Sequence, residues 1–236
     1  MRGDISTEMP ATYAVLTGDV IGSRRLTAKE LEAVFDDVRY LWKAFGSHHS
    51  GAVVGTLEIF RGDGWQAALA KPWLAVEAAA FLRAAFRAQE ATRRVDSRIG
   101  IGLGGVEHLD ANRLRESNGE AFQRSGAALE KLAKKQLCWG IDLGDEARLR
   151  SLTTTTLPLL DLLVCRWTRA EAAAVIGTLL GWTQDEIAAH PLAKKKDGKQ
   201  PTRQAIHDAL KRIGWASHLE PVMEEASRLL KETCHL

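Results

Sequence analysis

Hydrophobic positions along the first 150 residues change between strand-like and helix-like spacing, and the changes predict an ordered series of elements. Residues 12–19 are predicted to form a buried strand that ends in a Gly-Asp turn. Residues 27–46 carry apolar side chains at i, i+3, i+4 and i+7, which indicates an amphipathic helix, and Thr27 with Glu30 forms a capping box at its start. The elements predicted next are a hairpin around Gly62-Asp63-Gly64, a helix over 73–93, a strand over 97–109, a helix over 118–135 and a strand over 136–142.

The order of these elements is β-α-β-β-α-β followed by α-β, which is the split pattern of ferredoxin-like, palm-type domains. Four threonines at 153–156 and Pro158 are typical of a boundary. After them the spacing is helical. The elements predicted there are a helix over 159–180, a short helix opened by the capping box of Thr183 and Glu186, and a helix over 202–213 closed by Gly214.

This pattern predicts an α+β fold in two parts. We expect a palm-type domain over residues 10–152, followed by a small all-α domain over residues 157–236. A chain of 236 residues, 45% of them hydrophobic, is long enough to bury a sizeable core without disulfides. The three cysteines contain no CxxC pair, which argues against a disulfide framework or a zinc ribbon.

Charge and terminal sequence narrow the class of protein further. The net charge of +2 is nearly neutral, so the chain as a whole is not a basic nucleic-acid binder. The first residues lack the basic-then-apolar order of a signal peptide. The longest apolar stretch, 157–165, is far shorter than the roughly 20 residues that span a bilayer. We therefore expect a cytoplasmic protein with no membrane partner.

Two aspartates are predicted to meet at one edge of the sheet. In a split βαβ unit the first and second strands run parallel, and the third strand lies between them and runs back. The end of the first strand, with Asp19, and the hairpin turn, with Asp63, therefore lie at the same edge. Two adjacent carboxylates repel each other unless one is protonated or a cation lies between them. Oxygen ligands of this kind suit Mg²⁺ or Mn²⁺.

The turn that follows Asp19 offers groups that suit a phosphate chain. Its residues are Gly22, Ser23 and Arg24, whose backbone N–H groups and guanidinium could hold a triphosphate. The alternative interpretation is that both Gly-Asp pairs only supply turn chemistry. One pair alone favours that alternative, whereas two pairs at matching positions of this topology favour a site.

Four segments carry a resemblance to a known family. TGDVIGSR resembles the first metal motif of class III nucleotidyl cyclases, and FRGDGWQAAL resembles their Gly-Asp hairpin. RIGIGLGGV and NGEAF resemble the strand and the Gly-led helix that follow. The resemblance covers about residues 12–140. The chain is more closely similar to the SatD family of small bacterial proteins, which combine such an opening motif and hairpin with a C-terminal helical segment.

The cyclase resemblance implies roles for particular residues. It makes Asp19 and Asp63 metal ligands, assisted by the backbone carbonyl of Val20, and places the turn Gly22-Ser23-Arg24 on the phosphates of a nucleoside triphosphate or related nucleotide. Because cyclase sites usually lie across a dimer interface, it also implies a homodimer.

The chain departs from the cyclase pattern at three positions. Ile59 stands where many adenylyl cyclases place a base-reading Lys. Gln123 and Ala127 stand where cyclases place an Asn and a transition-state Arg. Arg124, next to the first of these, is the candidate substitute for contact with phosphate, although its direction on a helix differs by about 100°. By this resemblance the metal and phosphate half of the site is kept, and the half that reads the base and stabilises the transition state is not.

A local basic segment changes the interpretation of the near-neutral charge. Residues 194–212 hold seven basic and two acidic side chains, which leaves +5. Their layout resembles a helix-turn-helix domain, although about ten residues replace the usual turn of three or four. The second helix would present Thr202, Arg203, Gln204 and His207 to base edges. The predicted phosphate contacts are Lys194, Lys195, Lys196 and Lys199.

Three hypotheses of function follow. The first is a regulator that binds a metal–nucleotide ligand through Asp19 and Asp63 and binds DNA through its C-terminal domain. The alternative is a metal-dependent enzyme of nucleotidyl or phosphoryl transfer that uses the same aspartates. The third is a protein-interaction module that keeps the palm fold without its ligand.

Overall fold

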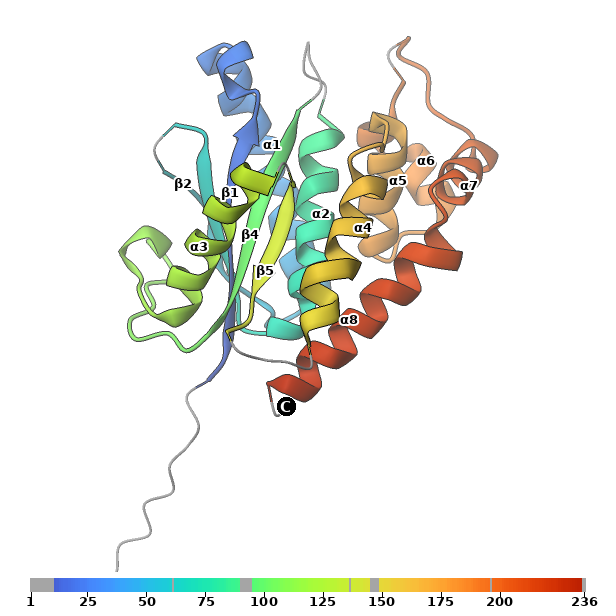
Figure 1. The fold of residues 1–236 in the computed structure, drawn as a ribbon. Helices are drawn as coiled ribbons and strands as arrows, with labels where there is room; N and C mark the ends of the chain where they lie inside the picture. The colour runs from blue at the N-terminus through green and yellow to red at the C-terminus, as the bar shows by residue number, and fades with distance from the viewer. Residues whose placement is uncertain are drawn as a thin grey trace, which may run out of the picture.

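One mixed sheet of five strands organises the protein, in the order β2-β3-β1-β4-β5 (Figure 1). The coordinates are a computed structural model that describes residues 11–60, 62–89, 95–135, 137–144, 149–195 and 197–234. The strands are β1 (Tyr13–Ile21), β2 (Val53–Phe60), β3 (Gly64–Leu69), β4 (Asp96–Gly104) and β5 (Trp139–Asp142).

The strand directions agree with the prediction. β3 lies between β1 and β2 and is antiparallel to both, so β1 and β2 run parallel. β4 is antiparallel to β1 on its other side, and β5 is parallel to β4. The fold is therefore α+β, with the ferredoxin-like strand order extended by one strand. Strand β1 continues to Ile21, so Asp19 lies inside the strand near its end rather than at its last position.

Helices cover both faces of the sheet. α1 (Ala28–His48) and α2 (Ala75–Arg87) pack on one face in a single core with Leu16 and Val20. α3 (Glu120–Lys135) packs on the other face. Glycines in β4 allow this close approach, because a Cβ on Gly102 would lie 2.3 Å from the backbone oxygen of Ala121.

The observed ends of α2 differ from the predicted helix over 73–93. A 3₁₀ turn at Pro72–Leu74 precedes α2, and the helix ends at Arg87. The last residues of the predicted helix, 90–94, lie outside the described residues.

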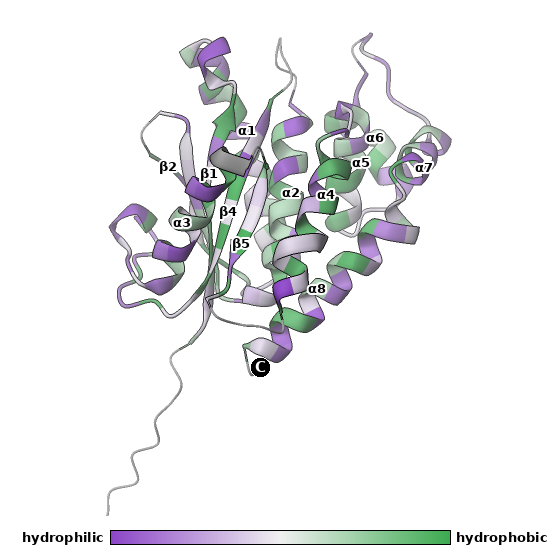
Figure 2. Cartoon of the chain, in the orientation of Figure 1, coloured by the Kyte–Doolittle hydropathy of each residue, from purple (hydrophilic) through white to green (hydrophobic). Residues whose placement is uncertain are grey.

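Five helices follow the sheet in the described part of the chain: α4 (Leu157–Val164), α5 (Arg169–Leu179), α6 (Gln184–Ala189), α7 (Arg203–Arg212) and α8 (Glu220–Thr233). α5 and α8 pack on α2, α4 contacts β5 and α2, and α6 and α7 pack on α5 (Figure 1). Apolar residues of α4, α5 and α8 join the core of the sheet, whereas those of α6 and α7 form a separate cluster with α5. Figure 2 shows hydrophobic positions on α2 and on the helices beside it.

The predicted helix over 159–180 is divided in two, because Thr168 and Glu171 form a capping box that starts a new helix.

The threonines at 153–156 lie in a π-helical turn that runs directly into α4. The core is continuous across this point, and the division into two domains stays a prediction. No helix in the described part of the chain is long and apolar enough to cross a membrane.

A buried ionic cluster joins α2, β4 and α4. Arg83 donates hydrogen bonds to both carboxylate oxygens of Asp96, at 3.1 and 2.7 Å, and another to Asp161. Arg87 donates to the same Asp96 at 2.6 Å. The Arg83 side chain is completely buried, with 0% exposure. The cluster holds α4 against the sheet and α2 through paired charges.

Candidate metal and phosphate site

The β2–β3 hairpin brings Asp63 beside Asp19. Asp19 faces Gly64 across the β1–β3 ladder, and the Val20 N–H donates to the backbone carbonyl of Asp63 at 3.1 Å. The two aspartates therefore lie at the same edge of the sheet, as the topology predicts. In an extended strand the N–H and C=O of one residue point to the same side, so the Val20 carbonyl also faces the hairpin.

Arg98 holds the carboxylate of Asp19. It lies directly opposite Asp19 in the β1–β4 register. Its Nε and Nη2 donate to the two carboxylate oxygens at 2.8 and 2.6 Å, which is a bidentate pair. The hydrogen bond to Asp19 raises the pKa of the Arg98 guanidinium, and the charge of Asp63 also contributes. The pair is partly open to solvent, with side-chain exposures of 33% for Arg98 and 27% for Asp19.

The predicted phosphate turn also reaches the carboxylates. The Ser23 hydroxyl donates to a carboxylate oxygen of Asp63. Ser23 opens a 3₁₀ turn over Ser23–Arg25, and Gly22 begins it with a φ of 76°, a left-handed conformation that favours glycine. The Arg24 side chain is exposed and has neither a hydrogen bond nor an ion pair with the described residues.

A buried hydrogen-bond chain fixes the backbone beneath the site. Trp65 Nε1 donates to Ser97 Oγ at 2.9 Å, and Ser97 Oγ donates to the backbone carbonyl of Asp19 at 2.7 Å. A Cβ on Gly18 would lie 2.4 Å from the Trp65 ring, so this strand position requires glycine. Trp65 itself is fully buried and packs on Phe86, which makes it a structural residue rather than one that could stack on a base.

Arg124, the candidate substitute for contact with the nucleotide phosphates, does not lie at this edge of the sheet. Its guanidinium bonds the backbone carbonyl of Leu103 at 2.5 Å and pairs with Glu120 at 2.5 Å. Leu103 is five residues from Arg98 along β4, or roughly 16 Å at about 3.3 Å per residue. The first turns of α3 lie over the end of β4, where Gly102 approaches Ala121 and Ser125, and this position along α3 places Arg124 at the far end of the strand.

Arg98 is the site residue that the sequence interpretation missed. It stands at the head of the apolar, glycine-rich stretch that forms β4, beside Asp96. A charged side chain in a strand that is otherwise apolar indicates a position with a special role, and this pattern could have pointed to Arg98. Its pairing with Asp19, however, depends on the register between two segments about 80 residues apart.

The donor set fits a hard divalent cation that keeps several waters. It comprises two carboxylates and the Val20 carbonyl, and the described residues contain no group of three His, Cys, Asp or Glu side chains that could hold a metal. Mg²⁺ and Mn²⁺ are bound through one or two carboxylates and complete their coordination with water and phosphate. A cation at this place would have to take over the carboxylate of Asp19 from Arg98.

The predicted DNA-contact residues lie on the surface of the C-terminal helices. Thr202, Arg203, Gln204 and His207 are exposed around the start of α7, opposite the buried Ile206. Thr202 caps the helix by accepting from the Ala205 N–H at 3.2 Å. Lys194, Lys195 and Lys199 are exposed in the long segment between α6 and α7, and Lys196 lies outside the described residues.

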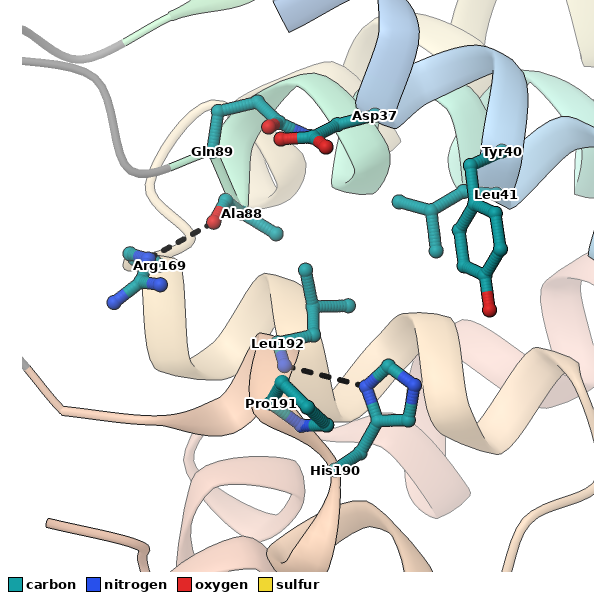
Figure 3. Close-up of a pocket in the computed structure, with 9 residues that line it drawn as sticks. All are labelled: Asp37, Tyr40, Leu41, Ala88, Gln89, Arg169, His190, Pro191 and Leu192. Atoms are coloured by element: carbon teal, nitrogen blue, oxygen red, sulfur yellow. Dashed lines mark hydrogen bonds between the residues drawn. The ribbon is translucent and has the colours of Figure 1, made fainter. Parts of the chain in front are cut away.

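A separate cavity of about 240 Å³ lies where α1 and the end of α2 meet the C-terminal helices (Figure 3). Figure 3 shows Asp37 and Gln89 on one side of it and His190 on the other. Burial lowers the pKa of His190, while burial and the neighbouring Asp36 raise the pKa of Asp37. None of the predicted site residues lines this cavity.

Comparison with known proteins gives a partial structural likeness at low sequence identity. No family model and no curated protein matches the chain. Among solved structures, the chain is similar to the active GGEEF domain of a diguanylate cyclase from Vibrio cholerae. That likeness has a TM-score of 0.39 and 15% sequence identity, and it covers 58% of this chain and 85% of the other. The resemblance to the SatD family stays a prediction.

Proposed function

We propose that the sheet edge at Asp19 and Asp63 binds a divalent cation, Mg²⁺ or Mn²⁺, together with the phosphates of a nucleoside triphosphate. The carboxylates and the Val20 carbonyl would hold the cation, and Ser23, Arg24 and Arg98 would contact phosphate oxygens. The observation that supports the proposal is the pairing of β1 with the hairpin, in which the Asp63 backbone lies beside Val20, next to the Asp19 carboxylate that Arg98 holds in a bidentate pair.

A cation could replace Arg98 as the partner of the Asp19 carboxylate at a small cost in free energy. Ion pairs open to solvent contribute about 0–1 kcal/mol, and this pair is about one-third exposed. A divalent cation between the carboxylates compensates both charges, so the Arg98 guanidinium is released beside the place where phosphate would bind. Guanidinium groups recognise phosphate by the same bidentate geometry that Arg98 now uses for Asp19.

The role that this site supports best is that of a ligand-binding regulator. Ile59, Gln123 and Ala127 offer neither a base-reading cation nor a transition-state arginine at the positions of the cyclase pattern. The alternative is nucleotidyl or phosphoryl transfer, in which the cation activates a hydroxyl. The homodimer implied by the cyclase resemblance belongs to the same proposal.

Thermal unfolding with each nucleoside triphosphate, in Mn²⁺ and in EDTA, tests the proposal. The midpoint should rise with one triphosphate and Mn²⁺ together, and the rise should disappear in Asp63→Asn. Asp142→Asn is the matched control, because Asp142 also ends a strand of this sheet and is 23% exposed. No rise with any triphosphate in the unmodified protein would contradict binding. Product formation that is lost in Asp19→Ala would assign the enzyme alternative.

A second candidate function is contact with DNA through the basic segment 194–212, for which the supporting observation is the exposure of its predicted contact residues. In a plot of log affinity against log salt concentration, each phosphate contact makes the slope more negative by about 0.9. Removal of Lys194, Lys195 and Lys199 should therefore reduce the slope by about 2–3 for a fluorescent DNA duplex. An affinity that does not respond to salt would exclude this function.

A further inference from the structure

The cavity of about 240 Å³ in Figure 3 lies between two parts of the chain. One wall comes from α1 and the end of α2, and the other comes from the start of α5 and the segment that follows α6. Since liquid water takes about 30 Å³ per molecule, the space corresponds to about eight waters. It is therefore large enough for one small organic molecule.

Two oxygen acceptors lie on one side of this cavity, on Asp37 and Gln89 (Figure 3). Gln89 is 8% exposed, and its Nε2 donates to the backbone carbonyl of Ala85 at 2.7 Å. This bond fixes the orientation of the amide, and the Oε1 atom accepts no hydrogen bond from a described residue. The Asp37 carboxylate likewise has no hydrogen bond or ion pair within the described ranges. A buried acceptor without a donor costs free energy, so a ligand that donates to both groups is favoured.

A hydrogen-bond donor lies on the opposite side of the cavity, on His190 (Figure 3). Its Nδ1 accepts from the backbone N–H of Leu192 at 3.2 Å, which places the ring proton on Nε2. Burial lowers the pKa of His190 and so favours this neutral form. In the part of the chain that the structure describes, no group accepts from Nε2. Leu41 and Leu192 also line the cavity and give it an apolar surface.

Arg169 is the cation among the lining residues, and it is already bound to the protein. Its Nε donates to the backbone carbonyl of Ala88 at 2.9 Å, and its Nη1 donates to that of Lys194 at 2.7 Å. If its charge acted strongly on Asp37, the pKa of that carboxylate would be lowered, but burial and Asp36 raise it instead. The carboxylate thus lacks a compensating charge, which favours a cationic ligand.

We propose that this cavity binds a small primary amine with an apolar body and an oxygen acceptor. The ammonium group has a positive charge and three N–H donors, which would contact the Asp37 carboxylate and Gln89 Oε1. The apolar body would lie against the two leucines, and the acceptor would take the N–H of His190 Nε2. Such a ligand would link α1 and α2 to the C-terminal helices. The proposal is independent of the Asp19–Asp63 site, and either can fail without the other.

The test screens the full chain against a fragment library by saturation-transfer NMR. The library holds equal numbers of primary amines, carboxylic acids and alcohols of about ten non-hydrogen atoms, a size that suits the cavity. The amines should bind most often, and calorimetric titration gives their dissociation constants. Asp37→Asn should weaken amine binding at least tenfold. Asp36→Asn is the matched control, because it removes the same charge one residue away and outside the lining, and it should change binding less than threefold.

Two further variants separate this site from general attraction between charges. In His190→Asn the new side chain can still cap the turn by accepting from the Leu192 N–H, but it lacks the Nε2 donor. This change should weaken amines that carry an oxygen acceptor by about two- to tenfold and leave amines without one unchanged. Leu192→Trp, at a half-buried lining position, fills the cavity and should weaken all the amines at least tenfold.

Several results would overturn the proposal. These are a library in which acids or alcohols bind as often as amines, a library without binding, and amines that bind Asp37→Asn or Leu192→Trp normally. An effect of His190→Asn that is the same for both groups of amines would contradict the contact with His190.

Discussion

Two arginine–carboxylate clusters lie two residues apart on strand β4, and they differ in their exposure to water. At Asp96, the Arg83 side chain is 0% exposed and the carboxylates of Asp96 and Asp161 are 12% and 8% exposed. At Arg98, the pair with Asp19 is 33% and 27% exposed. The hydrogen-bond geometry is bidentate in both clusters.

The difference shows how similar ion pairs can have different roles. In the buried cluster each charge depends on its partners, because water cannot replace them. In the exposed cluster water can solvate either partner, so a cation or a phosphate can replace one of them at small cost. We infer that the cluster at Asp96 is structural and that the cluster at Asp19 is the one suited to exchange partners with a ligand.

The largest expected effect is on stability. Arg83→Met leaves the carboxylates of Asp96 and Asp161 buried without their main partner, so the free energy of unfolding should fall by about 3–5 kcal/mol. Arg98→Met is the matched control and should cost less than about 1 kcal/mol, because Asp19 remains solvated. Urea unfolding followed by circular dichroism measures both. An equal loss in the free energy of unfolding in the two variants would contradict the distinction between a structural cluster at Asp96 and an exchangeable one at Asp19.

The next effect is a pH dependence near the buried cluster. Burial raises the pKa of the Cys138 thiol to about 11 from a usual value of 9.0, and the charges of Asp161 and Asp96 add to this against the opposing effect of Arg83. Between pH 9 and 11 the unfolded chain therefore loses this proton first, and the free energy of unfolding falls as the pH rises. We expect a loss of about 1 kcal/mol, since the thiol is only partly buried.

Urea unfolding of the unmodified protein and of Cys138→Ala at pH 8 and pH 11 measures this contribution. The difference between the two proteins cancels the titration of other groups. A difference that is the same at both pH values would show that the thiol titrates normally.

A smaller effect separates the two roles of Arg98. Arg98→Met removes the group that competes for the Asp19 carboxylate, so Mn²⁺ alone should bind up to about fivefold more tightly, which corresponds to about 1 kcal/mol. The same change removes a phosphate contact, so the triphosphate with Mn²⁺ should bind more weakly. Calorimetric titrations measure both affinities. A change of the same sign for both would contradict the exchange of partners.

The smallest effect is expected from the basic segment. Lys194, Lys195 and Lys199 are exposed, and the one ion pair of these side chains with a described residue joins Lys199 to Asp197 at 4.0 Å. Replacing all three with Ala should change the free energy of unfolding by less than about 0.5 kcal/mol. Urea unfolding checks this value. A larger loss would mean that the segment stabilises the fold and that its charges are not reserved for a partner.

The elements with local signals could be predicted from the sequence. The apolar spacing and the Thr27–Glu30 capping box predicted α1, and the Gly-Asp-Gly turn predicted the β2–β3 hairpin. The placement of Asp19 and Asp63 at the same edge of the sheet could be predicted from the strand order, because chain topology decides which strand ends share an edge.

The features that depend on strand register or on how a helix is placed along a strand could not be predicted. Arg98 faces Asp19 only because of the β1–β4 register, and Arg124 lies away from Asp19 because α3 begins over the end of β4. Asp161 interrupts an apolar run, and its buried partner Arg83 comes from a helix 78 residues earlier in the chain. Contacts of this kind require the assembled core.

The most direct test of the proposed site is a crystal structure of the protein with Mn²⁺ and a nucleoside triphosphate, with the anomalous signal of manganese recorded. We predict a manganese peak between the carboxylates of Asp19 and Asp63, with Arg98 released from Asp19 and directed to phosphate. A triphosphate bound elsewhere, or an Asp19–Arg98 pair that stays intact with no manganese beside it, would contradict the proposed site.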